Sequence, residues 1–392
     1  MSRVMIVAGE ASGDLHGANL VTATKTMAPD VEFYGMGGTR LAAAGVELFF
    51  DLEHMALMGI TEVISSLNRV WSTLKTLRNS LEQEKPAALV LIDYPDFNLR
   101  LAKAARAVGV PVFYYICPQI WAWRTGRIRL MEQWVDRRVV VFPFEVEFYN
   151  RHGLTADFVG HPLLDIMAPP RPKTEVKEEL GFDPDQEMLL LMPGSRKHLV
   201  AQLLPIMLQA AAMIRSKRPS LTLALARAET MPDSFLAPFL SQAPDDLKII
   251  SGRPHDLQNA ADVALVASGT ATLETALMLT PMVVVYRMNY LSYLLGRLLV
   301  RTDHVAMANL IAAERVVPEL IQGEVYPGRI ASELLKILES PEIRAGMVLK
   351  LNRIRDRLGK PGASRRAAEL LLLTINRGAG KLMTGPVETG VI

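Results

Sequence analysis

Several features that define large classes of protein are absent or scarce in this chain of 392 residues. Its single cysteine, Cys117, excludes an internal disulfide and any metal site built from several cysteines. Its 43 basic and 41 acidic side chains nearly cancel, which argues against general nucleic-acid binding. Disulfide frameworks, cysteine-bound metals and nucleic-acid binding therefore lie outside the expected functions.

Signals for export and for membrane insertion are also lacking. The sequence runs from Met1 directly into an apolar strand, with no charged leader, apolar stretch and cleavage site, so we expect a cytoplasmic protein. No run approaches the roughly 18 uncharged apolar residues of a membrane span. Any membrane contact is therefore expected to be peripheral.

The first glycine-rich turn, residues 8–17, lacks the common nucleotide-binding motifs. Its glycines recur every four residues and do not form G-x-G-x-x-G, and no Lys-Ser or Lys-Thr pair of a phosphate-binding loop is present. Both absences disfavour hydride transfer and ATP hydrolysis. The turn does carry polar side chains that we expect to face a cleft between two domains: Glu10, Ser12, Asp14 and His16. Taken alone, His16 is more typical of a helix surface.

The fold class expected from the pattern is α/β. Half of the residues are hydrophobic, and the length exceeds what one core usually supports, so two domains are expected. Short Val/Ile/Leu runs alternate with helical patterns, which indicates two doubly wound parallel sheets that face each other across a cleft. We expect strands at 3–8, 31–35, 88–92, 111–116, 138–142 and 157–159, and then at 188–192, 221–226, 247–251, 262–267 and 282–286.

Proline-rich residues 169–187 are expected to link two domains at 1–168 and 188–350, because prolines cannot join a ladder and they stiffen the chain. Further helices are predicted beyond 327, broken at Pro341 and at 360–362. Residues 351–392 should form C-terminal helices and a flexible tail that pack back on the N-terminal domain of this chain or of a partner.

Residues 265–279 combine a buried strand, a turn and a helix. The turn residues are all small: Ser268, Gly269, Thr270 and Ala271. Unpaired N–H groups of a helix's first turn bind diphosphate oxygens when small residues let them approach. Glu274 would then accept hydrogen bonds from ribose hydroxyls. An ordinary strand-to-helix connection, with Thr270 as N-cap and Glu274 in solvent, is the alternative.

Two carboxylates, Asp93 and Asp96, lie where an expected buried strand ends, just before Asn98. A carboxylate in a partly dry cleft can have its pKa raised towards the range useful for a base. Asp96 is the preferred base because it follows Pro95 and lies nearer the cleft. The alternatives are that Asp96 caps a helix and that Asp93 is the base.

A second small-residue turn, Pro193-Gly194-Ser195-Arg196, ends the first strand of the second half. Arg196 is positioned to meet a leaving diphosphate, because a guanidinium binds phosphate oxygens bidentately and stays charged. A surface arginine at a helix start would oppose the helix dipole, which favours an anion nearby.

An apolar stripe runs along residues 60–81 at steps of three and four. It includes Leu67, Trp71, Leu74 and Leu77. Such a stripe usually belongs to a core. Because basic residues interrupt it and Trp71 suits a membrane boundary, contact with an anionic membrane surface or with acyl chains is also open. The same two interpretations apply to residues 290–300.

Weaker signals follow other expected strands. Gln119 and Trp123 are candidates to line a sugar pocket, and His161 is a candidate either to bind a donor phosphate or to initiate a turn. Asn309 follows the nucleotide segment, with Glu319 and Gln322 further along.

These segments together closely resemble the bacterial lipid-A-disaccharide synthase family. The resemblance rests on residues 9–14, 96–98, 119–124, 193–196, 268–274 and 317–320, and it runs from residue 3 to about 325. It implies the glycosyltransferase B fold, with an N-terminal Rossmann-like acceptor and catalytic-base domain and a C-terminal Rossmann-like UDP-sugar donor domain. It also implies an inverting enzyme that condenses UDP-2,3-diacylglucosamine with 2,3-diacylglucosamine 1-phosphate to the β-1,6-linked lipid A disaccharide 1-phosphate and UDP.

The resemblance further implies residue roles. Asp96 matches the family's essential aspartate, Arg196 the arginine of the Pro-Gly-Ser-Arg turn, and Glu274 and Asn309 positions around the donor nucleotide. The chain departs from the family where a proline is expected directly before Asn309. Peripheral association with the cytoplasmic face of the inner membrane is implied as well, and an oligomer is compatible with it.

The expected mechanism is one in-line displacement by the acceptor's 6-hydroxyl. Asp96 takes the proton, while the helix N-terminus at 268–271 and Arg196 offset the charge of the leaving UDP, so neither a metal nor a cofactor is required. A UDP-sugar epimerase and a non-enzymatic UDP-sugar-binding protein share the fold and the nucleotide segment. Activity on an unacylated sugar would indicate the first, and tolerance to loss of Asp96 the second.

Overall fold

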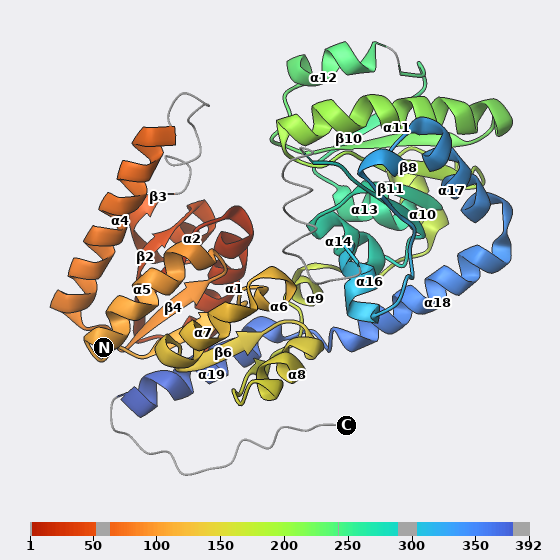
Figure 1. The fold of residues 1–392 in the computed structure, drawn as a ribbon. Coiled ribbons are helices and arrows are strands. Elements are labelled where there is room, and N and C mark those ends of the chain that lie inside the picture. Colours follow the sequence, from red (N-terminus) through yellow and green to blue (C-terminus); the bar gives the residue numbers. More distant parts are fainter. Residues whose placement is uncertain (1, 52–62, 242, 289–303, 379–392) are drawn as a thin grey trace. The chain divides into compact units, whose positions relative to one another are not determined.

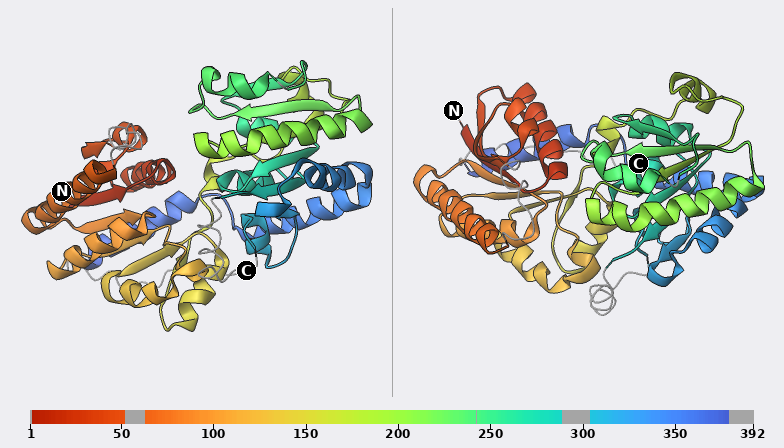
Figure 2. Two further views of the ribbon diagram at one scale, coloured as in Figure 1. Left: turned by 45° about the horizontal axis from the view of Figure 1, so that its top comes forward. Right: turned by 90° about the horizontal axis from the view of Figure 1, so that it is seen from above.

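The computed structural model describes residues 2–51, 63–241, 243–288 and 304–378. The chain divides into two compact units, one comprising Met1–Ile166 with Gly359–Ile392 and the other Met167–Leu358. Each unit is built on one parallel sheet with helices on its faces (Figures 1 and 2). The α/β class with two Rossmann-like domains is therefore confirmed.

The sheet of the first unit has the strand order β3-β2-β1-β4-β5-β6-β7. Its strands are β1 (Ser2–Ala8), β2 (Val31–Gly37), β3 (Val46–Asp51), β4 (Ala88–Ile92), β5 (Val112–Tyr115), β6 (Arg137–Val140) and β7 (Asp157–Phe158). Residues 4–8 of β1 and the whole of β4 are continuous apolar runs because both sheet faces are covered. They pair directly, with Ala8 opposite Ile92, so the loops that follow them emerge side by side at the carboxyl edge.

Helices cover both faces of this sheet. They are α1 (Ala11–Met27), α2 (Thr39–Ala43), α4 (Val63–Glu84), α5 (Pro95–Ala107), α6 (Ile120–Trp123), the 3₁₀ turn η2 (Thr125–Arg127), α7 (Ile128–Trp134), α8 (Pro143–Arg151), α9 (Leu163–Ile166) and α19 (Ala363–Gly378). Leucines of α4 share one buried cluster with α5 and α7. Apolar residues of α1 and α19 share the other.

The C-terminal helix α19 thus returns to the N-terminal sheet, where it packs beside α1 (Figure 1). Its apolar face includes Leu371 and Ile375, both buried. Asp165 caps its N-terminus by accepting hydrogen bonds from the N–H groups of Gly362 (2.5 Å), Ala363 (3.0 Å) and Ser364 (2.8 Å). A carboxylate at this position also complements the helix dipole, so it fixes where the chain re-enters the first unit.

The sheet of the second unit has the order β10-β9-β8-β11-β12-β13. Its strands are β8 (Met188–Met192), β9 (Thr222–Arg227), β10 (Lys248–Ser251), β11 (Val263–Ala267), β12 (Met282–Tyr286) and β13 (Glu319–Ile321). The other elements are α10 (Lys173–Glu179), α11 (Lys197–Lys217), α12 (Asp233–Leu240), α13 (Pro254–Ala260), α14 (Thr270–Leu277), α16 (Met307–Ala312), the 3₁₀ turn η3 (Gln322–Glu324), α17 (Pro327–Glu339) and α18 (Pro341–Arg357).

The boundaries between the units differ from those expected. Residues 169–187 belong to the second unit rather than to a linker, because α10 packs on α13 and buried Lys177 donates to Asp262 at 2.9 Å. Helix α18 also belongs to the second unit, so this unit ends at Leu358 rather than at residue 350. The predicted helix breaks at Pro341 and at 360–362 are confirmed.

Helix α11 is long and apolar enough to cross a membrane by length and composition, with a mean hydropathy of 1.4. It contains Pro205 and packs against α17. One of its faces is buried in the second unit, through residues such as Leu203, Leu204 and Met207. These contacts are those of a core helix in a globular unit.

Candidate active site

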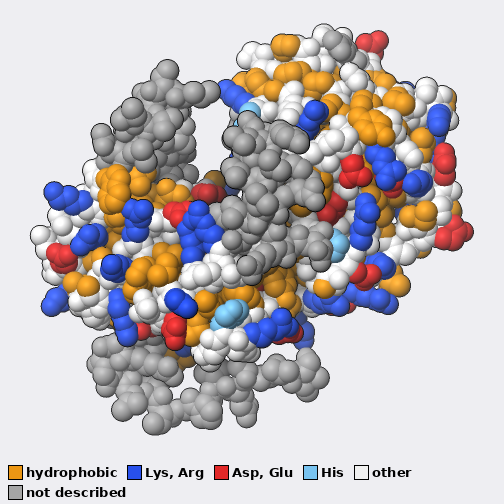
Figure 3. Space-filling view, viewed as in Figure 1, with side chains coloured by type: hydrophobic (Ala, Val, Ile, Leu, Met, Phe, Trp, Pro, Cys, Tyr) orange, Lys and Arg blue, Asp and Glu red, His pale blue; other side chains and the backbone are white. Residues whose placement is uncertain are grey.

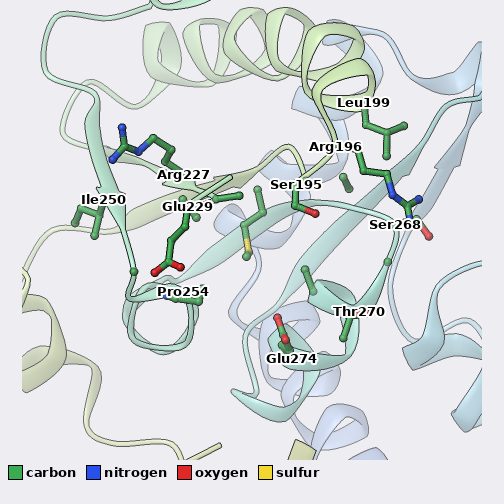
Figure 4. Close-up of a pocket in the computed structure, with 18 residues that line it drawn as sticks. Ser195, Arg196, Leu199, Arg227, Glu229, Ile250, Pro254, Ser268, Thr270 and Glu274 are labelled. Carbon is green, nitrogen blue, oxygen red and sulfur yellow. The ribbon is translucent and has the colours of Figure 1, made fainter. Parts of the chain in front are cut away.

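A pocket of about 530 Å³ lies at the carboxyl edge of the second unit's sheet (Figure 4). Residues that follow β8, β9, β10 and β11 form its walls, and helices α11, α13 and α14 begin beside it. Open α/β sheets bind their ligands at this edge. The volume suits a ligand of nucleotide size.

The turn between β11 and α14 presents backbone groups to this pocket. Gly269 is the N-cap of α14, with φ +154° and no capping side-chain hydrogen bond, a conformation that glycine adopts without steric cost. Thr270 is therefore the first helical residue, and the alternative in which it caps the helix is wrong. The four predicted small residues all line the pocket: Ser268, Gly269, Thr270 and Ala271. The N–H groups of Gly269, Thr270 and Ala271 offer an anion site, whereas the Ser268 N–H donates to the Val285 carbonyl (2.9 Å).

Glu274 lies one turn further along α14 and also lines the pocket. Its side chain is only 21% exposed, and its Oε1 lies 3.7 Å from Nε2 of His255 on α13. In Figure 4 its carboxylate lies in the pocket on the same wall as Thr270. This position suits a hydrogen-bond acceptor for ligand hydroxyls better than a carboxylate in open solvent.

Ser195 and Arg196 line the pocket from the turn after β8. Arg196 is the N-cap of α11, with an extended backbone, and its side chain is exposed (Figure 4). A cation at a helix N-terminus opposes the helix dipole unless an anion binds between them. The position therefore favours an anionic ligand that a guanidinium can bind bidentately.

Sequence reasoning missed the opposite wall of the pocket. Arg227 and Glu229 line it at the end of β9, Ile250 lines it from within β10, and Gly252 and Pro254 line it after that strand. The available signal was a charged residue, Arg227, that ends an otherwise apolar strand. Apolar Ile250 and Pro254 leave this wall suited to the flat face of a ring (Figure 4).

In the first unit, the loop after β4 is strained. Asp93 and Tyr94 have φ values of +46° and +45°, in the left-handed region that costs energy for residues other than glycine. Asn98 holds the loop by donating from Nδ2 to the carbonyls of Ile92 (3.1 Å) and Asp93 (2.7 Å). The Tyr94 ring lies against Gly9, where any Cβ would collide with it. Such over-determined strain is typical of functional sites.

Asp93 is half-buried beside the β1 loop. Burial, reinforced by the Glu10 carboxylate, raises the pKa of Asp93, and a backbone hydrogen bond to Tyr94 opposes the shift. Its backbone carbonyl accepts a hydrogen bond of 2.6 Å from the Tyr114 hydroxyl, which holds the residue in place. A carboxylate with a raised pKa is a better proton acceptor at neutral pH than an unshifted one.

Asp96 lies in the first turn of α5 and is exposed. The N-cap of that helix is Tyr94, so the alternative in which Asp96 caps the helix is wrong. Its Oδ1 accepts from Nη1 of Arg124 at 2.8 Å and from Nη2 of Arg127. A hydroxyl that approaches this carboxylate would therefore meet two guanidinium groups as well.

Two predicted site residues serve the fold instead. Asp14 is buried, and its carboxylate accepts from the N–H groups of Gly38 (2.7 Å) and Leu41 (3.1 Å) at the start of α2. Asn309 is fully buried, with its amide donating to the Val317 carbonyl (2.9 Å) and to Glu319 (2.8 Å). The predictions that Asn309 lies at the donor nucleotide and that Asp14 faces a cleft are therefore wrong, since neither side chain is available to a ligand.

Other predicted residues divide in the same way. Asn98 is buried, and its amide group donates to carbonyls of its own loop. His161 is buried, and its Nδ1 accepts from the N–H of Leu163 (3.2 Å), so it initiates the turn before α9. Ser12 and Gln119 are exposed at the starts of α1 and α6. The side chain of Trp123 lies outside the described residues.

The apolar stripe on α4 is mostly core. Leu74 and Leu77 are 5% and 0% exposed and belong to the cluster under α5, so their assignment to membrane contact is wrong. Trp71 is 55% exposed on the same helix. The side chain of Leu67 and residues 290–300 lie outside the described residues. Within the described ranges, no group of three or more His, Cys, Asp or Glu side chains is arranged to hold a metal ion.

The two parallel-sheet units define the class: the protein has the glycosyltransferase B fold, with a pocket of nucleotide size at the carboxyl edge of the second unit's sheet. The chain belongs to the lipid-A-disaccharide synthase family, whose model matches residues 4–371. The lipid-A-disaccharide synthase of Syntrophus aciditrophicus (strain SB) is 46% identical over 375 residues, which cover 95% of this chain and 98% of that protein. The protein is thus a glycosyltransferase of lipid A biosynthesis.

Solved structures share the fold at low identity. A co-structure of S. aureus MnaA with UDP has a TM-score of 0.66 at 13% identity and covers 100% of both chains. A putative UDP-N-acetylglucosamine 2-epimerase from Listeria monocytogenes has a TM-score of 0.63 at 14% identity and covers 97% of both. At such identities the likeness concerns the fold alone. Family membership therefore favours the glycosyltransferase over the epimerase alternative.

Proposed function

We propose that the protein transfers 2,3-diacylglucosamine from UDP-2,3-diacylglucosamine to the 6-hydroxyl of 2,3-diacylglucosamine 1-phosphate. The products are the β-1,6-linked lipid A disaccharide 1-phosphate and UDP. The pocket of the second unit carries the proposal, because it brings the α14 N-terminus, Glu274 and Arg196 into one volume. Membership of the family supports the acylated substrates.

In this proposal the donor nucleotide occupies that pocket. The N–H groups at the start of α14 bind the diphosphate, and Glu274 accepts hydrogen bonds from the ribose hydroxyls. Arg196 offsets the negative charge that grows on the leaving diphosphate. The wall formed by Ile250 and Pro254 accommodates the base.

The chemical step is a single displacement. The acceptor's 6-oxygen forms a bond to the anomeric carbon of the donor sugar, and the bond from that carbon to the diphosphate oxygen breaks. The hydroxyl proton passes to a carboxylate, which we assign to Asp96. Attack on the face opposite the leaving group inverts the configuration.

Asp93 is the second candidate for the base, on a specific observation. It is half-buried and its pKa is raised, whereas Asp96 is exposed and paired with two arginines. The two roles are separable: one carboxylate takes the proton while the other orders the loop.

The same proposal places the protein peripherally on the cytoplasmic face of the inner membrane. Both proposed substrates carry acyl chains, and exposed Trp71 suits a membrane boundary. Flotation with phosphatidylglycerol vesicles should recover the wild-type protein and less of Trp71→Ala. Equal recovery of the two proteins would show that Trp71 does not contribute to membrane binding.

The decisive experiment is to incubate the purified protein with the two acylated sugars in neutral detergent micelles. Mass spectrometry should detect the disaccharide 1-phosphate, UDP should appear in equal amount, and NMR should show a β linkage. A 2-epimer formed from an unacylated UDP-sugar, or UDP binding without turnover, would contradict the proposal.

A further inference from the structure

The first unit carries its own pocket, of about 440 Å³, on the surface formed by α4, α5 and α7. We name it the basic groove. Each helix contributes residues three to four positions apart, so one face of each helix is turned towards the same volume. On this surface in Figure 3, hydrophobic and basic side chains lie interspersed. Donor binding in the second unit makes no use of this groove.

The groove combines an apolar floor with a cationic rim. Leu74 and Leu99 line it and are only 5% and 4% exposed, so they form its floor. Its cations are Arg78, Arg100, Lys103 and Arg127, and Asp96 is the one acidic residue among the described lining residues. An excess of positive charge around an apolar floor suits an anionic amphiphile rather than a neutral or cationic ligand.

Two tryptophans contact two of these cations. The Arg100 guanidinium lies 4.9 Å from the centre of the Trp71 ring, and Lys103 Nζ lies 5.7 Å from that of Trp134. Cation–π contacts of this kind keep a charged group near an apolar surface. Without them the group would extend into water. Trp71 is 55% exposed and so leaves apolar area that a ligand can cover.

The groove is continuous with the proposed base. Asp96 and Arg127 both line it, and they are paired with each other. A ligand held in the groove by an anionic group therefore has its remaining polar groups within the same volume as the Asp96 carboxylate. A surface that only touched a membrane would require neither a concave pocket nor this continuity.

We infer that the basic groove binds the acceptor, with Arg100 and Lys103 contacting its phosphate and the apolar floor covered by the first part of an acyl chain. The inference rests on the proposed function, and it adds the part of the protein that recognises the acceptor's phosphate. The phosphate then anchors the sugar while its hydroxyl reaches Asp96. Guanidinium and ammonium groups are the usual protein ligands of phosphate.

The test compares two acceptors in neutral detergent micelles: diacylglucosamine 1-phosphate and the same lipid without phosphate. For the wild-type protein, removal of the phosphate should raise the acceptor KM at least tenfold. In the double variant Arg100→Ala/Lys103→Ala, the KM for the phosphorylated acceptor should rise about tenfold, the donor KM should stay unchanged, and removal of the phosphate should add less than threefold. Lys75→Ala is the matched control, because Lys75 is an exposed cation of α4 outside the groove, and it should match the wild type.

Each contrary result has a distinct meaning. If the double variant weakens both acceptors equally, or leaves both KM values unchanged, the groove does not bind the phosphate. If it instead loses only its binding to phosphatidylglycerol vesicles, the groove is a membrane contact and the inference is overturned. Arg100→Glu provides a second variant, and thermal unfolding shows that each variant is folded. If the wild-type protein forms no disaccharide, the proposed function itself fails, and the inference fails with it.

Discussion

The two proposed ligand sites are built in different ways. In the second unit, one contiguous segment, residues 268–274, supplies backbone N–H groups and a carboxylate to the pocket. In the first unit, Trp71, Asp96 and Arg127 reach the basic groove from three separate segments and act through their side chains. A backbone site depends on local conformation, whereas a side-chain site depends on how helices pack. Single side-chain substitutions should therefore be tolerated better in the second unit than in the first.

The largest expected effect is at the side-chain site. Asp96→Asn should lower kcat by about 10²- to 10⁴-fold, the usual contribution of a general base, while UDP binding measured by calorimetry stays unchanged. Asp93→Asn is the matched variant and should lose less. A greater loss of kcat in Asp93→Asn would move the proton acceptor to Asp93.

The second expected effect is a difference in acid stability between the units. Burial lowers the pKa of His16 to about 4 and that of His161 to about 3. The His16 imidazole lowers the pKa of His161 further, and the Asp165 carboxylate opposes both shifts. Because these folded-state values lie below the ordinary 6.5, the unfolded chain binds protons first. The stability that the two neutral histidines contribute to the folded chain is complete above about pH 6.5 and is lost as the pH falls towards 4.

Both histidines lie in the first unit, so acid should unfold that unit first. Urea denaturation measures how far the unfolding free energy falls between pH 7 and pH 4.5. This decrease should be smaller in His16→Gln than in the wild type, by on the order of 2–3 kcal/mol. Equal losses would show that His16 is protonated without unfolding. Intrinsic fluorescence and hydrogen exchange distinguish which unit opens.

A smaller effect is expected at the helix caps of the two units. Asp165→Ala removes a carboxylate that accepts from three N–H groups of the α19 N-terminus and should cost about 2 kcal/mol of unfolding free energy. Ser340→Ala in the second unit removes one acceptor, for Ile343 N–H at 3.2 Å, and should cost about 1 kcal/mol or less. Equal costs in thermal or urea unfolding would show that charge adds nothing at the α19 cap.

The smallest effect tests the backbone site directly. Thr270→Pro removes the N–H of the first helical residue at a position where proline is tolerated, and should weaken UDP binding about tenfold. Thr270→Ala keeps that N–H and should change the Kd by less than about twofold. If both variants lose affinity equally, the hydroxyl rather than the backbone binds the diphosphate.

Much of the fold was predictable because buried parallel strands are continuous apolar runs. All eleven expected strands are confirmed, whereas β3 and β13 were missed. Strand β3 lies at the sheet edge and mixes charged with apolar residues, and β13 spans only Glu319–Ile321. Such strands are recognisable only once a neighbouring strand supplies their hydrogen bonds.

The candidate site was predicted unevenly for a related reason. The segments around Arg196 and Glu274 combine a strand end, a small-residue turn and a helix start, so their placement at the pocket follows from local sequence. Asp14 and Asn309 carry equally polar side chains, yet both bond to buried backbone groups. Asp14 accepts from the Gly38 N–H, and Asn309 donates to the Val317 carbonyl. A residue type indicates a capacity for hydrogen bonding but does not identify the partner.

The amino-acid sequence by itself determined the positions of eleven strands, the small-residue turn at the start of α14 and the apolar stripe of α4, because each depends on neighbours within one or two turns. Tertiary structure decided which unit 169–187 and α18 join, which leucines of α4 are core, and that cations from α4, α5 and the turn η2 surround one groove. These outcomes depend on contacts between segments distant in sequence, whose free energy is realised only when both surfaces are folded and lose water together.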